Sequence, residues 1–104
     1  MKTLKFEGTS LDNLRKFPET ARKAAGFELH AVQKGENPSD WKPMTSIGPG
    51  VREIRLNEEG QYRIIYITKR ADEIHVLHAF QKKTKKTEKK DIDLAKNRYK
   101  GLLK

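Results

Sequence analysis

The chain has 104 residues, no cysteine and a formal net charge of +9 at pH 7. This length predicts a single domain over residues 1–104, and the lack of cysteine excludes disulfides and thiolate-based sites. No apolar run approaches the roughly 20 residues of a membrane helix, and the N-terminus lacks the apolar core of a signal peptide. We therefore expect a soluble, cytoplasmic protein with an anionic partner.

The first third of the chain predicts a strand followed by two helices. Residues 2–7 alternate between polar and apolar side chains, as in a short strand. Residues 10–17 form a short helix capped by a hydroxyl residue, and Pro18 suits the first position of a longer one that ends at Gly35. Small and aliphatic side chains recur in the longer helix at a spacing that makes one apolar stripe. The stripe consists of Ala21, Ala24, Ala25, Leu29 and Val32.

A β-hairpin is predicted after residues 35–50, a long connection rich in turn-forming residues. With residues 58–60 as its loop and Gly60 in the left-handed position, Arg55 lies directly opposite Arg63. Side chains alternate along each strand, so the hairpin has two different faces. One face carries Ile54, Leu56, Tyr62, Ile64 and Tyr66, and the other carries Arg55, Arg63, Ile65 and Ile67.

The last part of the chain predicts a strand and a helix. Residues 73–82 are nearly continuously apolar before they reach Lys82, which indicates a strand covered on both faces. Residues 88–100 form a helix with Thr87 as its cap and Gly101 at its end. The predicted order is β-α-α-β-β-β-α, an α+β domain. It has a small antiparallel sheet with the helical hairpin on one side and the C-terminal helix on the other.

Positive charge is concentrated in the last quarter of the chain. From Lys82 onward there are ten Lys or Arg against three acids, whereas the first 81 residues carry thirteen against eleven. A solubilising tail is one explanation of such a run. Apolar residues at helical spacing interrupt it, however, which favours an ordered, folded segment.

Arg55 and Arg63 are the first candidates for chemistry. Like charges directly opposite each other on paired strands repel and cost stability. Such a pair is most easily retained when an anion binds between the two side chains. Alternatively, each arginine pairs with a nearby acid such as Glu53, or lies in water at an edge. The spacing leaves both interpretations open.

A lysine cluster follows the predicted strand 73–82. The end of this strand brings Lys82 and Lys83 next to the two arginines, and crowding of cations lowers the pKa of a lysine, which suits acid–base catalysis. The other cations are predicted to follow a nucleic-acid backbone, although a solvated loop is the commoner role of such a run. These predicted RNA-binding residues are Arg52, Lys85, Lys86, Lys89 and Lys90.

The histidines do not predict a metal site, and no motif predicts a cofactor. His75 and His78 are three residues apart in a strand, so we expect them to point to opposite faces. His30 lies in a helix without a partner at ligand spacing. The chain has neither a P-loop nor a GxGxxG motif.

Four segments in order resemble the RelE/ParE toxin superfamily, and more narrowly its HigB-like branch, often described as phage-derived Gp49-like. The resemblance extends over nearly the whole chain, and the ordered set of segments is more specific than any one of them. The segments are Lys42–Met44, Gly48–Arg55, Gly60–Tyr66 and Val76–Thr84. The resemblance implies a RelE-like fold.

The resemblance also implies a type II toxin–antitoxin toxin. Such proteins cleave mRNA in the ribosomal A site without a metal, and a helix-turn-helix antitoxin silences them. In that family the cleft holds a basic residue of the first hairpin strand, the arginine of a Tyr-Arg segment and a basic residue after the last strand. The matching positions here are Arg55, Arg63 and either Lys82 or Lys83. Some relatives use a late tyrosine, but the helical spacing of Tyr99 predicts packing.

Two other functions remain open at this point. Relatives of the ParE type act by binding DNA gyrase, which would not need the arginines and lysines to converge. A basic module that binds RNA or DNA without catalysis would also have this composition.

Overall fold

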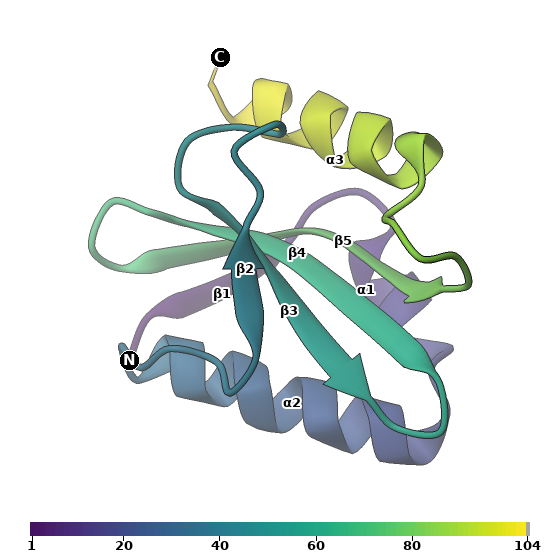
Figure 1. The fold of residues 1–104 in the computed structure, drawn as a ribbon. Coiled ribbons are helices and arrows are strands. Elements are labelled where there is room, and N and C mark those ends of the chain that lie inside the picture. Colours follow the sequence, from purple (N-terminus) through teal and green to yellow (C-terminus); the bar gives the residue numbers. More distant parts are fainter. Residues whose placement is uncertain (104) are drawn as a thin grey trace.

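The structure is a computed structural model that describes residues 1–103. It has one five-stranded sheet with helices on both faces, and α2 and α3 lie on opposite sides of it (Figure 1). In chain order the elements are β1 (Thr3–Phe6), α1 (Ser10–Arg15), α2 (Glu19–Gln33), β2 (Trp41–Pro43), β3 (Val51–Asn57), β4 (Gln61–Lys69), β5 (Glu73–Lys82) and α3 (Lys89–Leu102).

The predicted α+β class is confirmed, but the sheet is mixed rather than wholly antiparallel. Its strand order is β1-β5-β4-β3-β2, and β1 runs parallel to β5 while every other pair is antiparallel. No tight turn joins β1 to its neighbour, so no hairpin sets its direction. The connection over residues 35–50 also contains β2, a three-residue strand that sequence reasoning did not predict.

The hairpin of β3 and β4 has the predicted register, with Arg55 opposite Arg63 and Leu56 opposite Tyr62. Its turn differs in one detail. Glu59, at φ 57°, takes the left-handed position that we expected for Gly60, whose φ is 155°. The register is therefore set by the loop length, and the alternation of side chains places both arginines on one face of the sheet.

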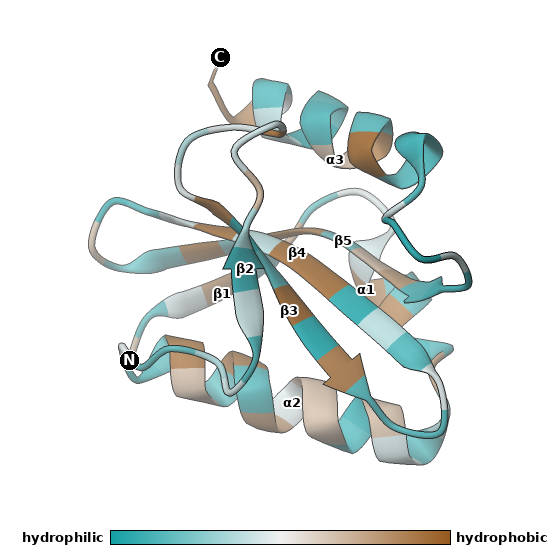
Figure 2. Ribbon diagram, viewed as in Figure 1, coloured by the Kyte–Doolittle hydropathy of each residue, from teal (hydrophilic) through white to brown (hydrophobic). Residues whose placement is uncertain are grey.

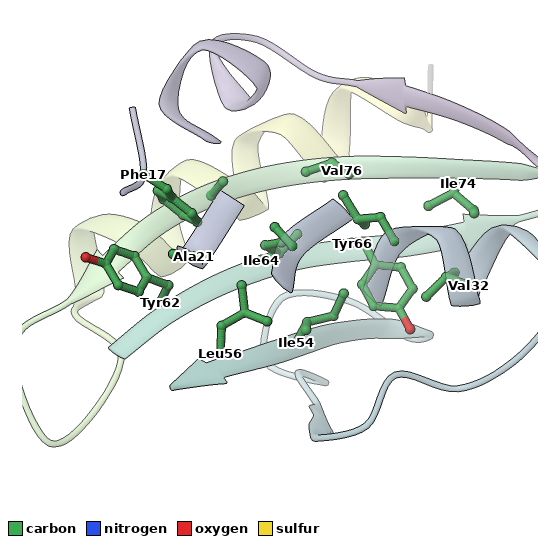
Figure 3. Packing of buried hydrophobic residues seen from close by; sticks show 13 residues of the cluster. Phe17, Ala21, Val32, Ile54, Leu56, Tyr62, Ile64, Tyr66, Ile74 and Val76 are labelled. Atoms are coloured by element: carbon green, nitrogen blue, oxygen red, sulfur yellow. The ribbon is translucent and has the colours of Figure 1, made fainter. Parts of the chain in front are cut away.

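The two faces of the sheet carry separate apolar cores. On the first face, Ala21, Leu29 and Val32 of α2 pack on the apolar side chains of the strands (Figure 3). All five hairpin residues predicted for that face are buried there: Ile54, Leu56, Tyr62, Ile64 and Tyr66. On the opposite face, Ala95 of α3 packs with Ile65 and Ile67. Apolar colour accordingly runs along the strands between the helices (Figure 2).

Of the predicted helix ends, only the C-terminal end of α2 is confirmed. Pro18, predicted as the first residue of α2, instead precedes its first residue, Glu19, in an extended conformation. Gly35, with φ 86°, follows α2 as expected of a helix stop. In α3, however, Gly101 lies inside the helix and Thr87 is not the cap, since Glu88 precedes the first helical residue. The hydroxyl of Thr87 instead donates to Glu53 of β3, a long-range contact that no local pattern reveals.

The prediction that His75 and His78 point to opposite faces is wrong. The pairing of β4 with β5 shifts between Ile65 and Tyr66, so His78 lies opposite Ile65 while His75 lies opposite Ile67. This bulge inserts an extra residue into β5 and resets the alternation. Both histidines consequently lie on the face that α3 covers.

No helix within residues 1–103 is both long enough and apolar enough to cross a membrane.

Candidate nuclease cleft

Three cations from three strands line one cleft. Arg55 of β3, Arg63 of β4 and Lys82 of β5 all contribute to its wall, and its volume is about 790 Å³. The pairing explains the convergence, because Arg55 faces Arg63 and Lys82 faces Gln61, two residues from Arg63. Residues two apart in a strand share a face. The predicted meeting of the two arginines with the lysine cluster therefore occurs, through Lys82.

Arg63 is the most firmly held of the three cations, and only 6% of its surface is exposed. Its Nη1 donates to the carbonyl oxygen of Tyr62 at 2.9 Å, and its Nη2 donates to Oε1 of Gln61 at 3.2 Å. Burial lowers the pKa of Arg63, and the charge of Arg55 adds to this effect. Arginine still keeps its charge at neutral pH, so the cleft contains a fixed, poorly hydrated cation.

A buried carboxylate, Glu53, lies beneath the cations. Its Oε1 is 3.7 Å from Nε of Arg63 and 3.8 Å from Nζ of Lys42, and its Oε2 accepts a hydrogen bond from Thr87 at 2.9 Å. Neither Glu53 Oε1 nor Arg63 Nε has a hydrogen bond within residues 1–103. The predicted alternative, in which an arginine pairs with Glu53, is thus confirmed for Arg63. This ion pair does not prevent Arg63 from lining the same cleft as Arg55 and Lys82.

Arg55 is held much more loosely. Its backbone N–H donates to the carbonyl oxygen of Asp40, but its guanidinium lies 3.9 Å from the Asp40 carboxylate, and 40% of its side chain is exposed. Exposed ion pairs of this length contribute little stability. Arg55 can therefore turn toward a bound anion at little cost.

Lys82 is half-buried and has no ion pair within the described part of the chain. Partial burial lowers its pKa, and the charge of Arg63 lowers it further, with smaller contributions from Lys42 and Arg55. Glu53 acts in the opposite direction. The predicted effect of crowded cations on a lysine pKa is thus present at Lys82, which makes this ammonium group a better proton donor than an isolated lysine.

The cleft also has an acidic and apolar side toward α2. Glu28 of α2 is buried and accepts hydrogen bonds from the backbone N–H and the hydroxyl of Ser39. The other two lining carboxylates lie nearer the strands, since Asp40 is 3.9 Å from Arg55 and Glu58 is in the loop between β3 and β4. Ala24, Phe27 and Leu56 supply apolar surface. Its strand side is therefore cationic and its helix side is mixed.

The remaining predicted lysines lie outside this cleft. Lys83 follows the last residue of β5 and is exposed, as are Lys85 and Lys86 in the loop before α3. Lys89 pairs with Asp93 at 3.4 Å, and Lys90 pairs with Glu88 at 3.7 Å. Lys83 as a catalytic residue, and the later lysines as RNA contacts, stay predictions. Of the two lysine alternatives, the geometry favours Lys82.

Arg52 lies on the sheet face that α2 covers, opposite to the face on which Arg55 and Arg63 lie. It faces Tyr66 across the strand pair, its guanidinium carbon lies 4.0 Å from the ring centre of Trp41, and its Nη1 donates to Asn37. Burial raises the pKa of Tyr66, and the neighbouring Arg52 partly offsets the rise. RNA binding by Arg52 stays a prediction, and it would involve a surface separate from the cleft.

Sequence reasoning missed Lys42 and Thr87 as neighbours of the cleft. Lys42 pairs with Glu53 across β2 and β3, and Thr87 precedes α3 by two residues. An indirect signal existed, since Glu53 alternates onto the same face as Arg55 and a buried carboxylate requires partners. Which partners it takes depends on tertiary structure.

Tyr99 packs, as its spacing predicts, within the α3 core. It lies against Gly48, where an added Cβ would be only 2.4 Å from the tyrosine ring.

The histidines have carboxylate neighbours: His78 Nε2 lies 2.8 Å from Asp91, and His75 Nδ1 lies 2.9 Å from Glu7. Burial lowers the pKa of His78. Within residues 1–103 no three His, Cys, Asp or Glu side chains form a potential metal site.

Comparison with known proteins identifies the family. The family described as phage-derived protein Gp49-like matches residues 12–100. The chain belongs to this family. Gp49-like proteins are part of the RelE/HigB-like toxin family, so the chain is of the RelE/HigB toxin type and is expected to have an antitoxin as partner. No curated protein matches the chain.

Proposed function

We propose that this Gp49-like protein is an endoribonuclease that cleaves mRNA in the ribosomal A site, in the cytoplasm, and that a helix-turn-helix antitoxin silences it. The observation that carries the proposal is the convergence of Arg55, Arg63 and Lys82 in one cleft. Three cations from three strands suit a single phosphodiester group better than a protein surface. For the same reason we favour cleavage over the gyrase-binding alternative.

The proposed reaction begins with attack of an RNA 2′-oxygen on the adjacent phosphorus. The bond to the 5′-oxygen of the next nucleotide breaks, which leaves a 2′,3′-cyclic phosphate and a 5′-hydroxyl end. The proton of the 2′-hydroxyl goes to water, and the departing 5′-oxygen takes a proton from Lys82. The lowered pKa of Lys82 supports this assignment.

Arg63 and Arg55 have different roles in this scheme. Negative charge grows on the phosphoryl oxygens as the 2′-oxygen attacks, and a donor already aimed at that charge stabilises the transition state without reorganising. Arg63 is buried and held by hydrogen bonds to Tyr62 and Gln61, so we assign this role to its fixed guanidinium. Arg55 is more exposed and supplies the initial attraction of the phosphate. The ribosome would supply much of the remaining positioning.

Induced expression followed by primer extension on a translated transcript tests the proposal. We expect cuts inside codons that appear with the wild-type protein and disappear with Arg63→Ala. Intact transcripts accompanied by DNA damage would instead support gyrase binding. Growth inhibition without either effect would support a non-catalytic nucleic-acid-binding module.

A further inference from the structure

We propose that Phe27 of α2 is the stacking surface for one base of the RNA substrate, at the helix side of the same cleft whose strand side holds the phosphate. This inference rests on the proposed function for its substrate. It adds to the cleft a binding residue from α2, whereas Arg55, Arg63 and Lys82 all come from strands.

The placement of Phe27 carries the argument. Its relative exposure is 70%, and it is the one exposed large apolar residue within residues 1–103 that does not lie at an end of the chain. A single exposed apolar side chain is ordinary on a protein surface. Phe27, however, lines the same cleft as Arg55, Arg63 and Lys82. An aromatic ring and several cations in one groove are the two parts of a binding site for single-stranded RNA.

The surroundings leave the ring available. Ala24, three residues earlier in α2, also lines the cleft, and residues three apart are neighbours on a helix surface. A methyl group is too small to cover a phenyl ring. A volume of about 790 Å³ accommodates a nucleotide with its phosphate toward the strands and its base toward α2.

The helix side of the cleft is also rigid. Ala21, Ala25 and Leu29 of α2 are buried in the core, and Glu28, next to Phe27, binds the backbone N–H and hydroxyl of Ser39. A ring on a fixed helix loses little freedom when a base stacks on it. The carboxylate of Glu28 disfavours a phosphate on this side, which leaves the base as the part of the nucleotide that fits.

Binding of a short single-stranded RNA carrying 2′-O-methyl groups, which block cleavage, tests the inference by fluorescence anisotropy. We expect Phe27→Ala to weaken binding by roughly 5- to 150-fold, the range for loss of one base–aromatic stack. Phe27→Trp should bind about as tightly as wild type, and Phe27→Leu, which keeps an apolar side chain without a ring, should resemble Phe27→Ala. On an RNA whose stacked position lacks a base, Phe27→Ala should cause no further loss.

The inference is overturned if Phe27→Ala binds as wild type, or if it weakens the abasic RNA as much as the intact one. It is also overturned if Phe27→Ala escapes neutralisation by the antitoxin while cutting mRNA normally, because Phe27 would then be an anchor for the protein partner. Failure of the proposed function looks different: the wild-type protein would bind the RNA through Phe27 yet leave ribosome-bound messages intact.

Discussion

The cations of this protein fall into two groups that differ in how the fold treats them. Arg63 is buried, hydrogen-bonded to Tyr62 and Gln61, and close to a buried carboxylate. Lys85 and Lys86 are exposed in a loop. Each of these side chains adds one positive charge to the protein. Only Arg63, however, is held in a fixed geometry. Positive charge that attracts RNA can be placed almost anywhere, whereas charge that stabilises a transition state has to be held in position.

The sharpest test of this comparison removes one cation from each group. Arg63→Gln should lower the rate of message cleavage by about 10²–10³, as loss of a preorganised donor does in other enzymes. Lys85→Gln should leave that rate nearly unchanged. Quantitative primer extension on ribosome-bound mRNA measures both variants. Equal effects would show that the cleft acts only through its total charge.

The carboxylate beneath the cations should matter for stability. Glu53→Gln leaves Arg63 buried without its counter-charge, and we expect a loss of about 3 kcal/mol in the free energy of unfolding, as when one partner of a buried pair is removed. Asp40→Asn is the matched control, because its ion pair with Arg55 is long and exposed, so its effect should stay below about 1 kcal/mol. Urea denaturation at neutral pH measures both. Similar midpoints for the two variants would contradict the role given to Glu53.

The lowered pKa of Lys82 predicts the direction in which the stability of the protein changes with pH. Its ammonium should titrate below its usual range in the folded protein, so the unfolded chain binds more protons in the interval between the two pKa values. Lys82 therefore contributes stability that rises with pH across that interval. Arg63→Gln removes a neighbouring positive charge and should move the pKa of Lys82 upward. NMR titration of the lysine side chain measures the pKa of Lys82 directly. If this pKa does not rise in Arg63→Gln, Arg63 does not contribute to lowering it.

The smallest effect is expected from the exposed lysines. Replacing Lys83, Lys85 and Lys86 by Gln should weaken RNA binding a few-fold, and it should reduce the slope of log affinity against log salt by about 0.7 for each RNA phosphate that is no longer neutralised. Stability should change by less than about 0.5 kcal/mol for each substitution. Lys23→Gln is the control, since Lys23 pairs with Glu19 within α2. Titrations at several salt concentrations compare the two proteins.

The sequence predicted those parts of the fold that local rules determine. The loop of three residues set the hairpin register and brought Arg55 opposite Arg63, and the apolar spacing in α2 identified its buried stripe. Strand direction at the N-terminus was not predictable in this way, because β1 has no turn to its partner. The bulge in β5 was equally hidden, and it reversed the expected orientation of His78 relative to His75.

The candidate site was predictable to a similar extent. Alternation placed Arg55 and Arg63 on one face, and the end of β5 delivered Lys82 to them. The support from Thr87 and Lys42 was missed because both reach Glu53 from other segments of the chain. Phe27 was missed because an exposed ring in a helix has no signature until the cleft beside it is known.

The contact between Gly48 and Tyr99 has a consequence for mutations remote from the arginines. The tyrosine ring occupies the space that any side chain at position 48 would need. A methyl group there would displace the ring or lift α3 from the sheet. Thr87, just ahead of α3, would then move relative to Glu53. A substitution at one loop position would thus alter the candidate site indirectly, by displacing Tyr99 and α3, although position 48 lies outside the cleft.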